Sequence, residues 1–379
     1  MPFGAGTGFV IETAEKRLKP GNLVLHGGGG GRNSDGSDPF FKVSEFLTLT
    51  GALAASEKTI CFIEAANPKA EPFREVIAEN GEKYIKLGIR ADNASTTTRD
   101  PQVLSAIERC TGFYFGGGAP ELLSISLLEK NGSDTPALAA IRRRHTQGAT
   151  VFGASAGAMM ASKTMLCECG SGSSVEALVD GKLRLAPGLN FAPNVLIDAH
   201  FLERGLIGRL VEAMKVLKEP FALGLDENTA VLIPSDGSPW TILGESGAAI
   251  VRLTDADKPY EALEIDLLAD GDRYDPKMRT VIVAPERQPI GPSQSTDSII
   301  PEIFEPGGFS NLLRLAALNT YGRAAGLSKV AASANIRITA TRTPETRVYF
   351  SPKLPLDRAY SITGLRLRIN APITRRGAA

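Results

Sequence analysis

Short apolar runs alternate with helix-length amphipathic segments from Asn22 to about Val251, and no other feature of the sequence restricts the fold as strongly. The apolar runs cover residues 22–26, 59–64, 112–115, 149–153, 195–198 and 222–226. The amphipathic segments cover residues 43–55, 101–110, 120–129 and 204–218. Continuous apolar strands that alternate with helices are typical of a parallel sheet covered on both faces. We therefore predict an α/β fold with a mainly parallel sheet and helices on both faces.

The pattern changes after about Val251. Charged turns there separate short strand-like runs, and the end of the chain alternates β-branched with polar residues. The strand-like runs are 262–268, 279–284, 336–339, 347–350 and 365–369, a loop-like stretch rich in proline, serine and glycine is 285–308, and an amphipathic helix is predicted at 309–325. We therefore divide the chain into an N-terminal arm (1–20), a main α/β domain that carries the candidate catalytic residues (21–251) and a β-rich C-terminal extension (252–379).

The balance of charges excludes some kinds of partner. Lysine plus arginine equals aspartate plus glutamate, at 42 residues each, so we expect neither nucleic acid nor a membrane surface as a partner. No apolar run is long enough to span a bilayer, and no signal peptide is visible. We expect a cytoplasmic protein by default, whereas a trimmed N-terminus would leave a secreted or periplasmic location open. The four cysteines do not form a disulfide framework in this interpretation, and Cys61 and Cys110 are read as small core residues.

A candidate nucleophile lies in the pentapeptide Gly153-Ala154-Ser155-Ala156-Gly157. A β-rich run precedes this G-x-S-x-G motif and a helix-compatible run follows it, which is the context that a nucleophile elbow needs. The turn is so tight that only small residues fit around the serine. The alternative is a plain glycine-rich turn with an incidental serine. The small residues at all five positions favour Ser155 as a nucleophile.

A serine nucleophile needs a base, and the chain has three histidines. His145 follows three arginines near a predicted helix C-terminus, where a cationic group complements the helix dipole. His26 ends the first strand, just before a run of glycines, and we interpret it as a local hydrogen-bonding residue. His200 follows an apolar strand at the same predicted sheet edge as Ser155. Position therefore favours His200 over His26 as the base.

The remaining groups of a catalytic site can be placed less firmly. Asp226 and Glu227 follow another apolar strand and either could orient the imidazole, although a polar turn between two buried strands explains them as well. Backbone N–H groups of Ala156 and of the glycines at 116–118 could form an oxyanion hole. The glycines at 27–31 lack the context of a phosphate-binding loop and are interpreted as a turn near the site.

These motifs together resemble the cyanophycinase and aspartyl-dipeptidase family of serine peptidases. The resemblance runs from about residue 21 to residue 250 and rests on the segments 21–29, 116–118, 153–158, 198–201 with Arg204, Gly205 and 208–210, and 224–230. It implies a class I glutaminase-like fold, a homodimer and no cofactor. It also implies that Ser155 is the nucleophile, His200 the base and Glu227 the orienting acid. Gly117, Gly118 and Ala156 would form the oxyanion hole.

The resemblance carries a substrate expectation and three departures from it. We expect a peptide with an aspartyl or β-aspartyl residue as substrate, with Asp198, Arg204 and Arg209 as candidate substrate-binding residues, because guanidinium pairs well with carboxylate. The alternative for Arg204 and Arg209 is a structural ion pair on the helix. Three positions that are polar or charged in cyanophycinases are here Pro120, Ala199 and Leu206, so the triad is kept while the substrate pocket is changed.

Two other functions compete with this hypothesis. One is a catalytically weak binding or scaffold protein of the same fold, against which the intact set of Ser155, His200 and Glu227 argues. The other is a serine amidase or esterase of other specificity. In esterases of the α/β-hydrolase type the acid precedes the histidine in the chain, whereas Glu227 follows His200 here. We expect no metal, since no histidine or cysteine lies in a metal-binding spacing.

Overall fold

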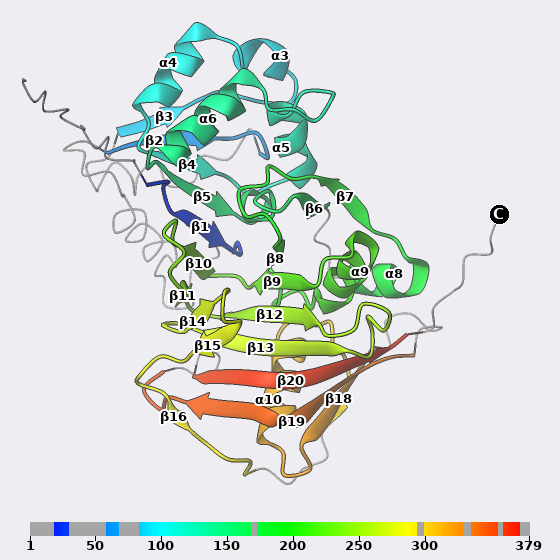
Figure 1. The fold of residues 1–379 in the computed structure, drawn as a ribbon. Coiled ribbons are helices and arrows are strands. Elements are labelled where there is room, and N and C mark those ends of the chain that lie inside the picture. Colours follow the sequence, from blue (N-terminus) through cyan, green and yellow to red (C-terminus); the bar gives the residue numbers. More distant parts are fainter. Residues whose placement is uncertain are drawn as a thin grey trace, which may run out of the picture.

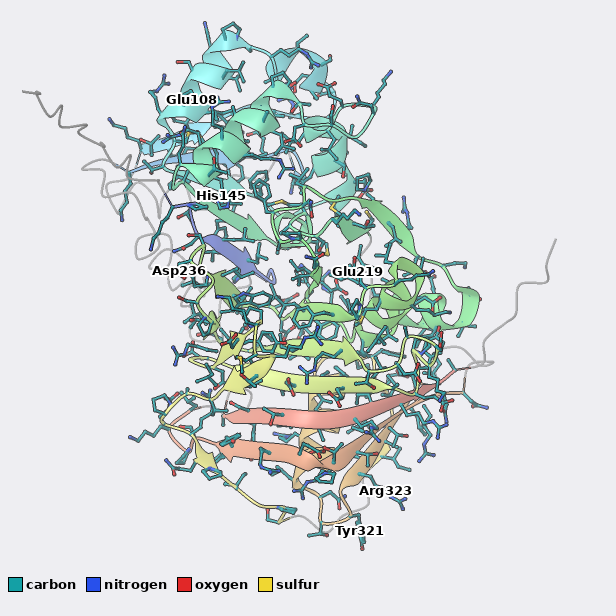
Figure 2. All side chains as sticks on the ribbon, in the orientation of Figure 1. Glu108, His145, Glu219, Asp236, Tyr321 and Arg323 are labelled. Atoms are coloured by element: carbon teal, nitrogen blue, oxygen red, sulfur yellow. A yellow bond between two sulfur atoms is a disulfide. The ribbon has the colours of Figure 1, made fainter. Side chains whose placement is uncertain are left out.

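The computed structural model describes residues 19–29, 58–67, 83–167, 173–293, 299–328, 335–354 and 359–371. Two large sheets dominate the molecule (Figure 1), and each has nine strands. The helices of residues 94–146 gather at one end, and the long strands of the last third form the other end (Figure 1). Figure 2 shows the same extent in side chains, with Glu108 near the first end and Tyr321 and Arg323 at the second.

The first sheet is half parallel and half antiparallel. Its strands lie in the order β15 (Thr280–Ile282), β14 (Arg273–Asp275), β11 (Trp240–Gly244), β10 (Thr229–Ile233), β1 (Leu23–His26), β5 (Thr150–Ala154), β4 (Gly112–Phe115), β2 (Thr59–Ile63) and β3 (Lys83–Lys86). Strands β1, β5, β4, β2 and β3 are parallel to one another. Strands β10, β11, β14 and β15 pair antiparallel, and β10 is also antiparallel to β1.

The second sheet joins strands from both predicted parts of the chain. Its strands lie in the order β17 (Ile299–Ile300), β18 (Arg323–Ser328), β19 (Ile336–Phe350), β20 (Tyr360–Asn370), β13 (Leu263–Ala269), β12 (Gly247–Leu253), β9 (Phe221–Leu225) and β8 (Leu196–Ala199), with β16 (Gln288–Pro289) also paired to β19. Most of its pairings are antiparallel, but β8 pairs with β9, and β17 with β18, in parallel. A separate hairpin-like pair consists of β6 (Thr164–Cys167) and β7 (Arg184–Pro187).

The helices cover the sheets and connect their strands. They are α3 (Ala94–Thr97), α4 (Pro101–Arg109), α5 (Pro120–Leu127), α6 (Pro136–Thr146), α7 (Ala156–Met159), α8 (Ser173–Asp180), α9 (Ile207–Leu217) and α10 (Gly308–Leu318). Three of them begin at a proline, whose fixed φ and missing N–H suit the first helical position. Helix α10 packs on β18, β19 and β20 and so covers one face of the second sheet.

The parallel strands β1, β2, β4 and β5 are buried on both faces, which explains their continuous apolar sequences, whereas the edge strand β3 is partly exposed. On one face, side chains such as Val24, Phe62 and Tyr114 form a small aromatic-rich cluster. On the other face, alternate residues such as Leu25 and Phe113 join the large core. Cys61 and Cys110 are fully buried, which confirms the interpretation of them as small core residues. They are also joined by a disulfide, which the sequence analysis did not predict.

Most predicted elements of the main domain are confirmed, whereas the predicted sheet is not. The six apolar runs correspond to β1, β2, β4, β5, β8 and β9. The prediction of a mainly parallel sheet is wrong, because the fold contains mixed sheets and places β8 and β9 in the second one. The predicted helix at 43–55 lies outside the described residues, as does most of the predicted arm at 1–20.

The extension differs in detail from the prediction. Helix α10 ends at Leu318 rather than at residue 325, because the chain turns there into strand β18. The two runs at 336–339 and 347–350 form one long strand, β19. The division at residue 251 stays a prediction, but it falls inside β12. One neighbour of β12, β9, precedes residue 251 in the chain, and the other, β13, follows it. Strands β14 and β15 of the extension also join the first sheet.

Candidate active site

Ser155 lies on a sharp turn between β5 and α7. Its backbone has φ 54° and ψ −115°, a conformation that L-residues rarely adopt and that often marks a functional site. The turn leaves no room for side chains on its glycines. A Cβ added to Gly153 would lie 1.9 Å from the carbonyl oxygen of Gly157, and one added to Gly157 would lie 2.0 Å from that of Phe115. The small residues of the motif are therefore required by packing as well as by the turn.

The structure brings Ser155, His200 and Glu227 together in one chain of hydrogen bonds. The Ser155 Oγ lies 2.8 Å from the Nε2 of His200, and the Nδ1 of His200 lies 2.6 Å from the Oε1 of Glu227. The serine follows β5 of the first sheet, whereas the histidine and the glutamate follow the parallel pair β8 and β9 of the second sheet. The chain of hydrogen bonds therefore spans the place where the two sheets meet.

The imidazole is enclosed, while the carboxylate remains partly open to solvent. The side chain of His200 is 9% exposed and that of Glu227 is 27% exposed. The hydrogen bond from His200 is the largest of the effects that lower the pKa of Glu227, and the charges of His200 and Arg204 act in the same direction. Arg204 Nη2 lies 3.4 Å from the same oxygen, Oε1, that His200 contacts. Glu227 therefore stays ionised over the neutral range.

The glycine loop after β1 lies directly against this pair. A Cβ added to Gly28 would lie 2.3 Å from the Cε1 of His200, and one added to Gly29 would lie 2.9 Å from the Cβ of Glu227. The carbonyl of Gly27 accepts a hydrogen bond from the N–H of His200 at 2.8 Å. The sequence indicated a turn near the site. It did not show that the loop touches the imidazole, although a strand that ends in consecutive glycines is a signal for such a close approach.

His26 supports this loop instead of contacting the serine hydroxyl. The Nδ1 of His26 accepts a hydrogen bond from the N–H of Gly28 at 3.2 Å, and its ring stacks on Phe152. The pKa of His26 is lowered to about 4. Burial is the largest cause, and the charge of the neighbouring His200 is the second. The third histidine, His145, lies at the end of α6 among the helices (Figure 2), where its Nδ1 contacts the carbonyl of Ala149 at 2.8 Å.

We expect acid to destabilise the fold through His26. Between the ordinary pKa of 6.5 and the folded pKa of about 4, the unfolded chain binds a proton that the folded chain does not. Stability therefore falls as the pH falls through this window, by about 3 kcal/mol in the limit. Denaturant unfolding of the wild type and His26→Asn between pH 4 and pH 7 measures the difference, because asparagine does not titrate there. A His26 imidazolium resonance at pH 6 would contradict this expectation.

The glycines before α5 lie beside the serine. A Cβ added to Gly117 would lie 3.1 Å from the Cβ of Ser155 and 3.5 Å from its Oγ, so the Gly117 backbone adjoins the hydroxyl. Gly118 has φ +140°, and a Cβ there would lie 2.2 Å from the carbonyl oxygen of Ala66. Ala156 directly follows the serine and is fully buried. The structure therefore places Gly117 and Ala156 next to Ser155, while Gly118 packs against the carbonyl of Ala66.

The three candidate substrate-binding residues divide into two kinds. Asp198 and Arg209 form a buried bidentate ion pair, in which Arg209 Nε donates to Asp198 Oδ2 at 2.9 Å and Nη2 donates to Oδ1. Their side chains are 0% and 2% exposed, which leaves no surface for a ligand in this structure. The side chain of Arg204 is 38% exposed and lies beside Glu227. Only Arg204 of the three therefore lies where a substrate can reach it.

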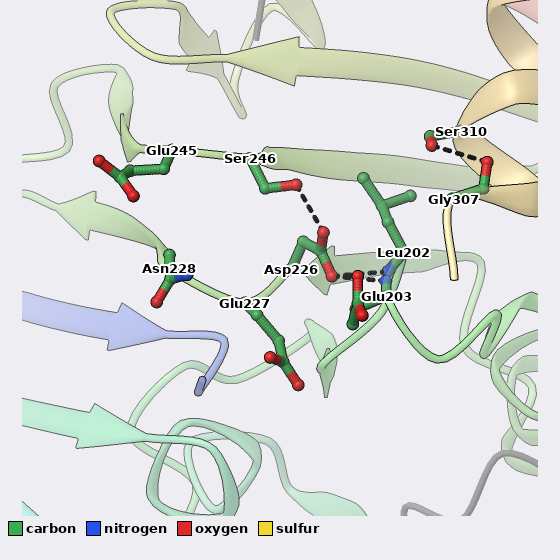
Figure 3. A pocket seen from close by; sticks show the side chains of 9 residues that line it. All are labelled: Leu202, Glu203, Asp226, Glu227, Asn228, Glu245, Ser246, Gly307 and Ser310. Atoms are coloured by element: carbon green, nitrogen blue, oxygen red, sulfur yellow. Dashed lines mark hydrogen bonds between the residues drawn. The ribbon is translucent and has the colours of Figure 1, made fainter. Parts of the chain in front are cut away.

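A pocket of about 400 Å³ opens on the Glu227 side of the site (Figure 3). Carboxylates of Glu203, Asp226, Glu227 and Glu245 line it, and the extension contributes to its wall at the start of α10. Burial, together with the charges of Asp226 and Glu227, raises the pKa of Glu203. The sequence analysis found Asp226 and Glu227 but missed that residues from the extension approach them. A local sequence pattern does not report contacts between residues that lie far apart in the chain.

The described part of the chain shows neither a metal cluster nor a membrane helix. Among its residues, no three histidine, cysteine, aspartate or glutamate side chains gather in a way that could hold a metal ion. None of the helices in these ranges is both long and apolar enough to cross a membrane.

The chain matches a known peptidase family and is similar to known cyanophycinases. The model of peptidase family S51 matches residues 24–238. Cyanophycinases from Trichormus variabilis and from a Nostoc species are each 32% identical to the chain over 262 residues, which cover 63% of this chain and 83% of the relative. A solved structure of a peptidase from an acI-B1 Actinobacterium aligns with 62% of this chain and 91% of its own, at 20% identity and a TM-score of 0.47.

These matches define a hydrolase of peptide bonds of the serine type. The chain belongs to peptidase family S51 and is similar to the cyanophycinases within it. The resemblance that its motifs carry is thereby confirmed.

Proposed function

We propose that this peptidase cleaves a peptide or isopeptide bond next to an aspartyl residue, through an acyl-enzyme on Ser155. The observation that carries the proposal is the continuous chain of hydrogen bonds from the Ser155 hydroxyl through His200 to Glu227. In this interpretation the turn after β5 is a nucleophile elbow, whose unusual backbone at Ser155 exposes the hydroxyl above the sheet.

We assign a role to each member of the proposed triad. Because ionised Glu227 can only accept a hydrogen bond, His200 carries its proton on Nδ1 and leaves Nε2 to accept from Ser155. His200 then takes the hydroxyl proton as Ser155 attacks the carbonyl carbon, and returns it to the leaving amine. Glu227 stabilises the imidazolium that forms. Water hydrolyses the acyl-enzyme by the same proton transfers in reverse.

We assign the oxyanion hole to backbone N–H groups of Gly117, Gly118 and Ala156. The closeness of the Gly117 backbone to Ser155 supports this assignment, as does the position of Ala156 immediately after the nucleophile. Backbone donors fixed by tight glycine packing need little reorganisation when negative charge develops on the substrate oxygen, which is how such donors lower the barrier.

We assign recognition of the substrate carboxylate to Arg204. Its partial exposure and its position beside the triad support this role. The buried pair of Asp198 and Arg209 instead links the end of β8 to α9, and we assign it a supporting role next to His200. We also propose that the extension shapes the substrate approach, since Gly307 and Ser310 line the pocket beside Glu227. A homodimer remains our expectation for the assembly.

The positions that differ from cyanophycinases give a prediction about specificity. Ala199 and Leu206 are fully buried and apolar, and Pro120 begins α5, so none of the three side chains offers a hydrogen bond. A substrate group left unpaired in a buried site costs about 1–3 kcal/mol each. We therefore expect kcat/KM on the β-aspartyl-arginine polymer to be lower than on β-aspartyl-leucine by about a hundredfold or more.

Side-by-side kinetics with purified protein, on the polymer and on both β-aspartyl and α-aspartyl dipeptides, measure this difference. Efficient cleavage of the polymer would contradict the specificity prediction. Peptides without any acidic residue are the control. If they are cleaved as well as the aspartyl peptides, the assignment of Arg204 and the aspartyl specificity are wrong.

A further inference from the structure

Asp226 is a buried carboxylate that directly precedes Glu227, the proposed triad acid. The mechanism above does not use Asp226. The residue is 5% exposed and lines the pocket shown in Figure 3. Burial raises the pKa of this carboxyl, although hydrogen bonds from Ser246 and from the backbone act against that effect. Burying a carboxylate is costly unless its oxygens are hydrogen-bonded, so its contacts show what the fold gains from it.

The Asp226 carboxylate holds the backbone that directly follows His200. Its Oδ1 accepts hydrogen bonds from the N–H groups of Leu202 and Glu203, at 3.0 Å and 2.8 Å. These are the second and third N–H groups of the tight turn at 201–206 that leads into α9. An acid that accepts two consecutive N–H groups at the start of a turn acts as a helix cap does, but here it comes from another strand.

The carboxylate is itself fixed from a third direction. Its Oδ2 accepts a hydrogen bond from the hydroxyl of Ser246 at 2.5 Å, and the Asp226 N–H donates to the carbonyl of Gly247 at 3.1 Å. Gly247 is the first residue of β12, and Ser246 directly precedes it. The end of β9 and the start of β12 therefore form a rigid base under the turn that carries His200.

His200 needs such support because its own backbone is in an unfavourable conformation. Its φ is 57°, in the left-handed region that histidine adopts only when the surroundings hold it there. Upstream, Gly27 fixes its N–H, and downstream, its carbonyl accepts from the N–H of Arg204 at 3.1 Å. Between these two contacts, the N–H of Phe201 donates to the carbonyl of Leu225 at 3.0 Å, and the N–H groups of Leu202 and Glu203 donate to Asp226.

We propose that Asp226 is a positioning residue that sets the direction of the His200 imidazole, while the adjacent Glu227 holds the ring itself. This inference rests on the proposed function of Ser155, His200 and Glu227. Two consecutive acids thus act on the same histidine in different ways. Glu227 contacts the Nδ1 atom, and Asp226 fixes the main chain from which the ring projects.

Asp226→Asn tests the proposal with a minimal change of shape. Asparagine keeps one oxygen for the two N–H groups, but its bonds lose the strengthening that a charged acceptor gives. We expect kcat to fall about 10- to 100-fold with KM changed less than about threefold, since small misplacements of a catalytic group have costs of this size. The rate of labelling by a serine-directed fluorophosphonate should fall by the same factor, because it depends on activation of Ser155 by His200.

Asp272→Asn is the matched control. Asp272 is also buried, accepts from two backbone N–H groups, those of Ala269 and Ala284, at 2.9 Å each, and accepts from the hydroxyl of Ser361. It lies in the extension and also pairs with Arg287. If Asp226 served stability alone, the two variants would lower the unfolding temperature and leave kcat per folded molecule equally unchanged. We expect only Asp226→Asn to lower kcat.

Ser246→Ala provides a second test should Asp226→Asn fail to fold. It removes the bond to Oδ2 and keeps both bonds from Asp226 to the turn, so we expect a loss in kcat of a few-fold with KM unchanged. A wild-type kcat in every folded variant of Asp226 and Ser246, or a loss that appears only in KM, overturns the proposal.

Ser155→Ala is assayed in parallel. If Ser155→Ala still turns over, the proposed function fails and the Asp226 inference with it. If Ser155→Ala is inactive while Asp226→Asn is fully active, only the Asp226 inference fails.

Discussion

Ser155→Ala and His200→Ala are each expected to lower kcat/KM by about 10⁴- to 10⁶-fold, and the double variant is expected to be no worse than either single one. The hydrogen bond between Ser155 Oγ and His200 Nε2 makes the two groups one chemical unit. Without the hydroxyl there is no nucleophile, and without the imidazole the hydroxyl keeps its proton. A second substitution therefore has nothing further to remove.

Steady-state kinetics on an aspartyl dipeptide and labelling by a fluorophosphonate measure this effect together. Labelling should disappear in Ser155→Ala and become very slow in His200→Ala. Circular dichroism and the unfolding temperature show whether each variant is folded. Near-wild-type turnover in folded His200→Ala would rule out His200 as the base. His26 is then a poor substitute, because its Nδ1 already accepts from Gly28.

The parts of the fold that local pattern determines could be predicted from the sequence. The strands β1, β2, β4, β5, β8 and β9 were found because burial on both faces leaves continuous apolar runs, as in 149–153 and 222–226. The partition of those strands into two sheets was not found. Strand β1 pairs with β10, more than two hundred residues away in the chain, and the pairing of β9 with β12 continues the second sheet into the extension. An apolar run shows that a strand is buried but not which strand lies beside it.

The candidate site shows the same division between local and distant information. The turn at Ser155 could be predicted because its constraint lies in five consecutive small residues. The choice between Asp226 and Glu227 could not be made from spacing, since adjacent residues after a strand point in different directions. In the structure Glu227 contacts the imidazole, whereas Asp226 points to the turn at Leu202. The buried ion pair of Arg209 with Asp198 could not be predicted either, because a single arginine or aspartate in a sequence can equally well bind a ligand.

The glycine loop after β1 gives the prediction with the second-largest expected effect. Gly28→Ala would place a methyl group 2.3 Å from the Cε1 and 2.5 Å from the Nε2 of His200, on the nitrogen that faces Ser155. Real Cβ atoms do not approach so closely, so either the ring or the loop must move. The ring is held by Glu227 on its other nitrogen, and the loop is held through the carbonyl of Gly28, which accepts from the N–H of Asn228 at 2.8 Å. Any relief therefore disturbs the proposed triad.

We expect Gly28→Ala to lower kcat about 100- to 1,000-fold, because a displacement of roughly 1 Å at a catalytic group costs on that order. Gly132→Ala is the control that separates this effect from backbone strain. Gly28 has φ +97° and Gly132 has φ +82°, so both substitutions force alanine into the left-handed region, but a Cβ at Gly132 meets nothing within 4 Å. Both variants should lose about 1 kcal/mol of folding stability through the backbone. Only Gly28→Ala should lose turnover, and equal activity in the two variants would show that the imidazole does not depend on this glycine.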